Sequence, residues 1–357
     1  MKSKWNDSEA LKFTKKFKNK NISKELAYRI YSSRLLGNDS SLVLHGGGNT
    51  SLKSKLMNSQ GLLEEIIYVK GSGKDMSNIT PSDFPSLELK NLLKLKKMKK
   101  INDFQMLNYQ KKYMVDTSFP NSSIETLLHA FLPFKYVDHC HSTAILSIIN
   151  QPQSISICNK VFGKNYSIVP YIMPGFDLSK KAIEIFEKNP NILGLILLNH
   201  GIFTFGNTAK QSYERMIKCV SLAEKELKNQ IKKKKYIKYS ETKINTSKLA
   251  NLLRKYTSIN KGDDFERKII TYSELPFINN LFSIKYNGGP TTPDHVIRIK
   301  HKPLFLDFSK IKKENIENTL SIKIYKYQKE YIKYFNRNKH LNKNAIMHDP
   351  NPRIIVV

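Results

Sequence analysis

The sequence predicts an α/β fold, in which helices cover a β-sheet, followed by a second α/β unit. Apolar residues recur at helical spacing over residues 8–36 and again from about 208 to 232. Between these stretches lie short strand-like runs next to glycine-rich turns, a pattern typical of sheets whose loops bind ligands. With 357 residues, the chain exceeds the ~250 to 300 residues at which one hydrophobic core stops growing. One large domain, or a domain with an appendage, is therefore expected.

The N-terminal part of the chain begins with a helix over residues 8–36, for which Ser8 is the predicted N-cap and Gly37 the predicted end. Strand-like runs follow within residues 41–55 and 64–76, and each lies beside a glycine-rich turn. We therefore expect a sheet here, whose two loops are the first candidates for a ligand site.

The middle of the chain alternates between helix and strand. Ser122 or Ser123 can cap a helix with one apolar face. Residues 136–150 switch to an alternating, β-rich run, and residues 192–206 form two buried strands that a sharp Asn-His-Gly break separates. The long amphipathic helix that follows ends near Lys232 in lysines that complement the helix dipole.

Residues 233–265 are polar and rich in lysine, and we interpret them as a linker or a domain boundary. This division predicts a first domain over residues 1–232 and a C-terminal extension over residues 266–357. The extension contains the segment NGGPTTPDHVIRIK, a helical stretch around residues 314–337, and the final segment DPNPRIIVV. We expect it to be a second α/β unit.

A formal net charge of +30 suggests nucleic-acid binding, because clustered Lys and Arg release counterions from a phosphate backbone. Most lysines are scattered among Asn and Ile, however, and only Lys94 to Lys100 and Lys232 to Lys235 form dense runs. A solvated surface is the favoured interpretation, which argues against a nucleic-acid partner, and a polyanion-binding protein is the alternative. A basic surface would also attract an anionic substrate.

The three cysteines, Cys140, Cys158 and Cys219, are too few and too irregularly spaced for a disulfide framework, which favours a reducing compartment. The N-terminus lacks the apolar core of a signal peptide, and no stretch approaches the ~18 uninterrupted apolar residues of a membrane span. The sequence therefore predicts a cytoplasmic protein without a membrane partner.

Three histidines are candidate ligands of a divalent metal ion. His139 and His141 lie two residues apart in a strand-like run, and side chains at i and i+2 of a strand point to the same face. His200, where a glycine breaks a strand, would complete a three-histidine set with an open position, as in catalytic zinc sites. By itself, the His-x-His pair is more typical of core or surface histidines.

Glu125 is the candidate proton donor and acceptor. It lies at the start of the helix that precedes the His-x-His run, so its carboxylate could lie close to the metal. A simple capping role in the first turn of the helix is the alternative. His129 lies four residues later on the same helical face, and a packed or hydrogen-bonded structural role is favoured for it.

Three segments have the composition of phosphate-binding loops, because glycines expose backbone N–H groups and a lysine adds charge. The segment GGGNTS matches neither the Walker nor the dinucleotide fingerprint, and as bare turns these segments need no ligand. The three segments are Gly46 to Ser51, Gly71 to Lys74, and Ser122 with Ser123.

The order of these motifs resembles that of the class II aldolase/adducin family over roughly residues 25–230: GGGNTS, VKGSG, SSIE, HCH and NHG. Longer segments look most like the aldolase portion of bifunctional rhamnulose-1-phosphate aldolase/alcohol dehydrogenases, and that match extends over almost the whole chain. These segments are HGGGNTSLK, YVKGSGKDM, SIETLLHAFLP, VPYIMPGFDL and GPTTPDHVIR.

The resemblance implies a class II aldolase-like, three-layer α/β/α fold with a central, mainly antiparallel sheet and a C-terminal α/β extension. It implies that His139, His141 and His200 hold a divalent ion, with Zn²⁺ as the expected one, and that Glu125 is catalytic. It also implies a homo-oligomer and a phosphate loop at Gly48, Asn49, Thr50 and Ser51, with Gly71, Ser72, Ser122 and Ser123 nearby.

The resemblance further implies a reaction. We expect a metal-dependent aldolase, a carbon–carbon lyase that cleaves a ketose 1-phosphate such as rhamnulose 1-phosphate into dihydroxyacetone phosphate and an aldehyde. A sugar-phosphate 4-epimerase or a decarboxylase on the same metal site is the alternative. An adducin-type binding module is disfavoured by the intact histidines. No NAD chemistry is expected, because the sequence ends at Val357 before any dinucleotide-binding loop.

Overall fold

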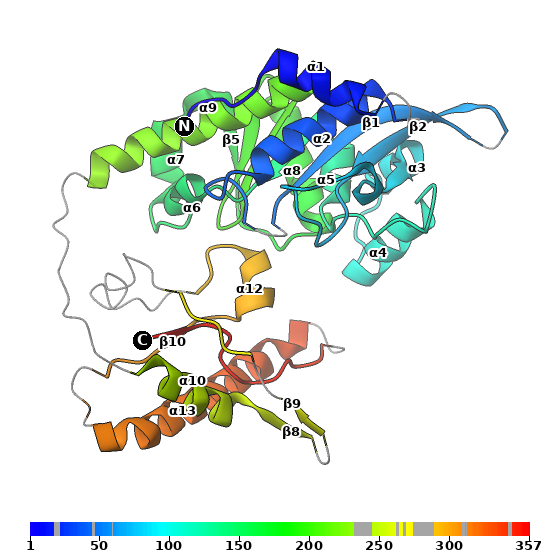
Figure 1. Cartoon of the computed structure of the whole chain (residues 1–357). Coiled ribbons are helices and arrows are strands. Elements are labelled where there is room, and N and C mark those ends of the chain that lie inside the picture. Colours follow the sequence, from blue (N-terminus) through cyan, green and yellow to red (C-terminus); the bar gives the residue numbers. More distant parts are fainter. Residues whose placement is uncertain are drawn as a thin grey trace. The chain divides into compact units, whose positions relative to one another are not determined.

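In the computed structural model the chain divides into two units, Met1–Lys233 and Lys234–Val357 (Figure 1). The structure describes residues 1–17, 22–44, 47–58, 60–231, 245–261, 264–266, 269–273, 289–308, 311, 313–341 and 345–357. Among these residues, no helix has both the length and the apolar content needed to span a bilayer.

The first unit is built on one seven-stranded sheet with the strand order β3–β2–β1–β4–β7–β6–β5. Strands β5 and β6 run parallel, and the other neighbours pair antiparallel, as the family resemblance implied. The strands are β1 (Asn49–Met57), β2 (Leu63–Val69), β3 (Ser86–Glu88), β4 (Tyr136–Cys140), β5 (Tyr166–Val169), β6 (Gly194–Leu197) and β7 (Gly201–Gly206).

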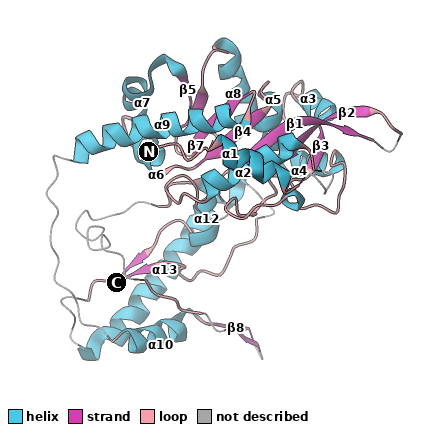
Figure 2. Cartoon of the chain, turned by 45° about the horizontal axis from the view of Figure 1, so that its top comes forward, coloured by secondary structure: helices cyan, strands magenta, loops and turns pink. Residues whose placement is uncertain are grey.

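Helices cover both faces of this sheet, which Figure 2 shows with the strands in magenta and the helices in cyan. Separate apolar clusters fill the spaces between the sheet and the helices on its two faces, which confirms the three-layer fold class. One face carries α3 (Leu89–Leu95), α4 (Asp103–Lys112), α5 (Thr126–Phe131) and α8 (Phe176–Lys188). The other carries α2 (Lys24–Gly37), α6 (Thr143–Ile149), α7 (Ser154–Phe162) and α9 (Ala209–Ile231), with α1 (Asp7–Lys15) packed on α2.

The strict alternation of side chains along a strand decides which residues meet which helix layer. In β4, Val137 belongs to the core beneath α5, whereas Tyr136 and Cys140 face the opposite layer. His139 therefore points to the α5 side, and its neighbour Asp138 points to the α2 side. This alternation of faces along β4 determines which groups surround His139 and Asp138 in the site described below.

Two of the predicted boundaries were wrong in detail. The helix expected over residues 8–36 is two helices, α1 and α2, and residues 18–21 between them lie outside the described part. The N-cap is Asn6 instead of Ser8, because the Asn6 side-chain oxygen accepts hydrogen bonds from the N–H groups of Ser8 and Glu9. Gly37 does end α2, as its last residue.

The β-rich run expected over residues 136–150 ends early. Strand β4 stops at Cys140, and residues 143–149 form α6. The apolar residues of that stretch fall at positions 144, 145, 146, 148 and 149, which suits one face of a helix as well as a short apolar run, so periodicity alone could not separate the two.

The second unit has its own apolar core between α10 and α13, to which Leu253 and Tyr327 contribute. Helix α10 lies within residues 233–265, where a linker or boundary was predicted. The Lys232 to Lys235 run falls outside the described residues. The elements are α10 (Thr246–Thr257), β8 (Ile259–Lys261), β9 (Asp264–Glu266), α12 (Pro293–Ile299), β10 (Leu304–Phe305), α13 (Ile316–Asn338) and β11 (Ile355–Val356).

Candidate metal centre

Three histidines from two neighbouring strands converge at one end of the sheet. His139 lies in β4 and His141 directly follows it, while His200 lies in the turn that joins β6 to β7. Because β7 pairs with β4, this turn lies beside the end of β4. All three side chains are buried, and one nitrogen atom from each lies within 4.8 Å of those of the other two. In the described part of the chain, no other His, Cys, Asp or Glu residues gather in this way.

The distances between these side chains fit the ligands of a single metal ion. The Nε2 atoms of His139 and His141 are 2.9 Å apart. Oε2 of Glu125 lies 3.3 Å from His139 Nε2, and Oε1 of Glu125 lies 3.3 Å from His200 Nε2. Two nitrogen ligands at about 2.0–2.1 Å from a tetrahedral Zn²⁺ are themselves separated by about 3.3 Å. The 2.9 Å between His139 and His141 is close to this value, and the ligand nitrogens of all three rings lie within 4.8 Å of one another, so the three imidazoles fit a divalent ion of this size with Glu125 beside it.

The protonation of the imidazoles also suits metal binding, which needs a neutral ring with a free lone pair. Burial lowers the pKa of His200 to about 4, although the nearby Glu125 carboxylate acts in the opposite direction. His139 Nδ1 lies 3.0 Å from the backbone oxygen of Ile202, to which it donates, so its Nε2 lone pair faces the other two histidines. A backbone acceptor of this kind commonly orients a metal ligand.

Two glycines make room for this arrangement. A Cβ atom at Gly201 would lie 2.6 Å from the backbone oxygen of Cys140 and 2.8 Å from Cδ2 of His141. Gly48 has φ +62°, and a Cβ atom there would lie 2.7 Å from the backbone oxygen of His139. The glycine after His200 is thus required because the His141 ring and the β4 backbone occupy the space of a side chain.

Glu125 occupies the N-cap position of α5, but it does not cap the helix with its side chain. Its carboxylate instead accepts a 2.7 Å hydrogen bond from Asn49 Nδ2 and lies against His139 and His200. The side chain is 5% exposed. The simple capping role that the sequence left open is therefore not what the structure shows.

The three candidate phosphate segments lie side by side at the same end of the sheet. The Lys70 N–H donates to Thr50 O at 3.0 Å, and the Ser123 N–H donates to Lys70 O at 3.2 Å. Gly71 and Ser122 form an isolated antiparallel bridge. Three segments that are far apart in the sequence are therefore joined by backbone hydrogen bonds next to the histidines.

Within these segments, most of the hydroxyl groups point into the protein. Thr50 Oγ1 lies 2.8 Å from Ser33 Oγ, and Ser51 Oγ lies 2.8 Å from Nδ1 of His129, on opposite faces of β1. The expected phosphate contacts by these two side chains are therefore not supported by the geometry. In the described structure, Ser122 Oγ is buried without a hydrogen-bond partner. It is the hydroxyl best placed to bind a ligand oxygen.

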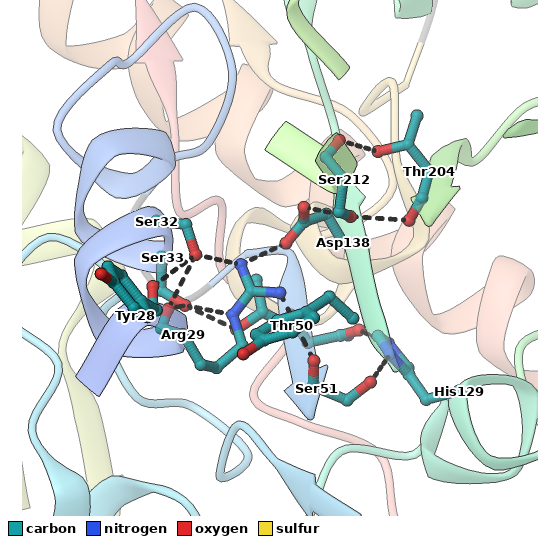
Figure 3. A network of polar contacts seen from close by, with 12 residues as sticks. Tyr28, Arg29, Ser32, Ser33, Thr50, Ser51, His129, Asp138, Thr204 and Ser212 are labelled. Carbon is teal, nitrogen blue, oxygen red and sulfur yellow. Dashed lines mark hydrogen bonds and ion pairs between the residues drawn. The ribbon is translucent and has the colours of Figure 1, made fainter. Parts of the chain in front are cut away.

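Sequence reasoning missed a buried ion pair that supports both the loop and the histidine strand (Figure 3). Arg29 from α2 lies 2.5 Å from Asp138 Oδ1 in β4, and both side chains are fully buried. Arg29 also donates to Ser51 O at 3.4 Å, and Ser212 from α9 donates to Asp138. The only local signal was a carboxylate beside a histidine, and nothing in the helix pattern marked its arginine partner.

Family models match most of the chain. Residues 29–227 match the class II aldolase and adducin N-terminal domain, and residues 245–357 match the aldolase class II second domain. The uncharacterized oxidoreductase YuxG of Bacillus subtilis (strain 168) is 31% identical over 343 residues, which are 92% of this chain and 49% of that protein. The chain thus spans about half the length of the curated relative that it matches.

One solved structure shows the same fold for the first unit. The N-terminal class II aldolase domain of a conserved protein from Thermoplasma acidophilum is 38% identical, with a TM-score of 0.57, over 64% of this chain and 99% of that one. An L-fuculose-1-phosphate aldolase from Thermus thermophilus is 15% identical, with a TM-score of 0.37, over 58% of this chain and 97% of that one. The second similarity is too distant to bear on the fold or the substrate.

We predict that Gly201→Ala weakens divalent-metal binding about 10- to 100-fold, the range usual when the support of a metal ligand is lost. The added methyl group would displace the His141 ring, because the backbone oxygen beside it cannot move freely. Competition with a chromophoric chelator measures the affinity. Gly61→Ala is the control, since a Cβ atom there meets open space, and its positive φ makes alanine the more strained substitution of the backbone, away from the site. Wild-type affinity in Gly201→Ala would contradict the proposed packing.

We also predict that Arg29→Met lowers the free energy of unfolding by about 3–5 kcal/mol, because it leaves the Asp138 carboxylate buried without its charge partner. The double variant Arg29→Met/Asp138→Leu should recover part of this loss, since no unpaired charge remains. Urea denaturation measures the free energy of unfolding of the single and the double variant. Lys188→Met, which breaks an exposed pair with Glu184, should cost less than about 1 kcal/mol. A double variant with strictly additive losses would argue against the pairing.

Proposed function

Because this chain belongs to the class II aldolase and adducin family, we propose that it is a metal-dependent lyase that cleaves a carbon–carbon bond of a sugar phosphate. The convergence of three buried histidines on the Glu125 carboxylate carries this proposal. A family member that served only as a binding module would have no need to bury four such groups together, at a cost in desolvation.

His139, His141 and His200 would hold the ion, for which we propose Zn²⁺ because three neutral imidazoles with an open position are a common catalytic zinc set. When bound, such an ion supplies Lewis-acid chemistry that polarises a carbonyl group. The protein keeps the three rings in place through the paired strands β4 and β7, so the ligands need little rearrangement.

Glu125 is the proposed general acid and base. Its carboxylate is held within 3.3 Å of two metal ligands, so it would lie beside any substrate carbon or oxygen bound there. A carboxylate in this position can accept a proton from the substrate and return it to the product. The Asn49 amide holds one of its oxygens, which leaves the other directed toward His200.

The substrate phosphate is proposed to lie against the joined segments around Gly48, Gly71, Ser72 and Ser122. Backbone N–H groups at glycine-rich turns are suitable anion donors, and the buried Ser122 hydroxyl can add one more. In this proposal Asn49, Thr50, Ser51 and Ser123 shape the loop from behind, because their side chains are engaged with protein groups.

The proposed substrate is a ketose 1-phosphate such as rhamnulose 1-phosphate, which would give dihydroxyacetone phosphate and an aldehyde. The experiment is to incubate the zinc-loaded protein with rhamnulose 1-phosphate and fuculose 1-phosphate and to analyse all products. Cleavage gives two fragments, whereas a 4-epimerase gives an isomer and a decarboxylase acting on a suitable acid gives CO₂. Recovery of an isomer without fragments would replace the lyase proposal with the epimerase.

We predict that His200→Ala reduces the zinc content of the purified protein from about one ion per chain to near zero at limiting zinc, because three protein ligands are needed for tight binding. Elemental analysis after dialysis measures this. The exposed His340→Ala variant is the control and should keep its zinc. Full zinc content in His200→Ala would place the ion elsewhere.

We predict that Glu125→Gln lowers turnover by about 10² to 10⁴, the usual contribution of general acid–base catalysis, while zinc content stays intact. The amide is nearly isosteric but cannot take up a proton. Steady-state kinetics measures turnover, and elemental analysis measures zinc content, so a loss of catalysis is separated from a loss of metal. The surface substitution Glu226→Gln serves as the control. Wild-type turnover would remove Glu125 from the mechanism.

A further inference from the structure

A buried chain of hydrogen bonds runs from β1 to the Glu125 carboxylate. His129, on α5, is fully buried, and its Nδ1 lies 2.8 Å from Ser51 Oγ. Its Nε2 is hydrogen-bonded to Asn49 Oδ1. The Asn49 Nδ2 atom in turn lies 2.7 Å from Glu125 Oε2. Four side chains from two elements are therefore connected in one line that ends at the carboxylate.

The direction of every hydrogen bond in this series follows from the Glu125 carboxylate at its end. An ionised carboxylate can only accept, so Asn49 must present its NH₂ group to Glu125 and its oxygen to His129. The His129 Nε2 atom must therefore carry the proton. A neutral imidazole has one donor and one acceptor, so Nδ1 accepts from the Ser51 hydroxyl.

The surroundings keep His129 neutral and immobile. Burial lowers the pKa of His129 well below its ordinary value, and the nearby His139, Lys53 and Arg29 act in the same direction. The edge of its ring packs on Phe203 at a centroid distance of 5.2 Å. At the far end of the chain, Ser51 is held through its backbone oxygen by Arg29, as Figure 3 shows.

We propose that His129 is a positioning residue for Glu125: its Nε2–H group holds the Asn49 amide in the one orientation that presents NH₂ to the carboxylate. An amide cannot relay a proton, so the chain acts by orientation alone. Without the His129 donor, the Asn49 amide is held only at its nitrogen, by Glu125 and Ser123, so its oxygen loses this anchor and the Nδ2 donor is less firmly placed against the carboxylate. This inference rests on the proposed acid–base role of Glu125.

Two substitutions of the same residue test this inference. In His129→Gln the amide nitrogen is three bonds from Cβ, as Nε2 is, so the donor to Asn49 is kept. In His129→Asn the amide nitrogen is two bonds from Cβ, as Nδ1 is, so that donor is lost. We expect kcat within about threefold of wild type for His129→Gln and about 10- to 100-fold lower for His129→Asn, with KM little changed in both.

A stability control separates positioning from general loosening. Ser179→Ala also removes a buried hydrogen bond, 2.9 Å long, within α8 and away from the site. It should lower the midpoint of unfolding without lowering kcat. Equal kcat losses in His129→Gln and His129→Asn would overturn the inference, because they differ in the position of the donor.

A double-mutant cycle tests whether His129 acts through Glu125. In a Glu125→Gln background, His129→Asn should produce no further loss of kcat, because the group that it positions is already removed. Multiplicative losses would overturn the inference. If Glu125→Gln alone has no effect, the proposed acid–base role fails instead, and the two failures are distinguishable.

The tautomer of His129 can be determined by NMR spectroscopy, without an activity assay. In the metal-free protein labelled with ¹⁵N-histidine, the ring signals that disappear in His129→Gln belong to His129. We expect the shifts of a neutral ring protonated at Nε2. A ring protonated at Nδ1 would overturn the inference whatever the kinetics show, because Nε2 could then not donate to Asn49.

Discussion

Strand β4 carries two buried polar residues in succession, and the rest of the site depends on their pointing to opposite faces of the sheet. Asp138 pairs with Arg29 on the α2 side, and His139 faces Glu125 on the α5 side. Each would be costly to bury alone, and each has partners from a different helix layer. The strand therefore ties the packing of both layers to the geometry of the candidate metal centre.

The electrostatics of the site support a bound cation. Glu125 is nearly fully buried, and burial keeps His200 and His129 neutral, so neither supplies a positive charge beside it. The Asn49 amide offers a dipole and no charge. A divalent ion between the carboxylate and the imidazoles would offset the desolvation cost of burying Glu125. Removal of the ion would therefore destabilise the buried carboxylate, and removal of the carboxylate would weaken ion binding.

Local patterns made the histidines candidates, because His139 and His141 follow the period of a strand and Gly201 marks the break after His200, but it was the family resemblance that joined the three into one predicted metal site. Local patterns could not place the hydroxyls of Thr50 and Ser51, since the face that each occupies depends on where β1 starts and on its pairing with β4. The partnership of Arg29 with Asp138 lay beyond reach for the same reason: it forms only when α2 packs on the sheet.

The alternation in β4 also limits how this protein can change its length. An inserted or deleted residue before Asp138 would exchange the faces of Asp138 and His139, burying a carboxylate among the apolar side chains under α5 and turning an imidazole toward Arg29. By contrast, Gly61, in the turn between β1 and β2, is exposed, and a side chain added there would meet open space. Natural and engineered length variants should therefore accumulate in that hairpin and spare the histidine strand.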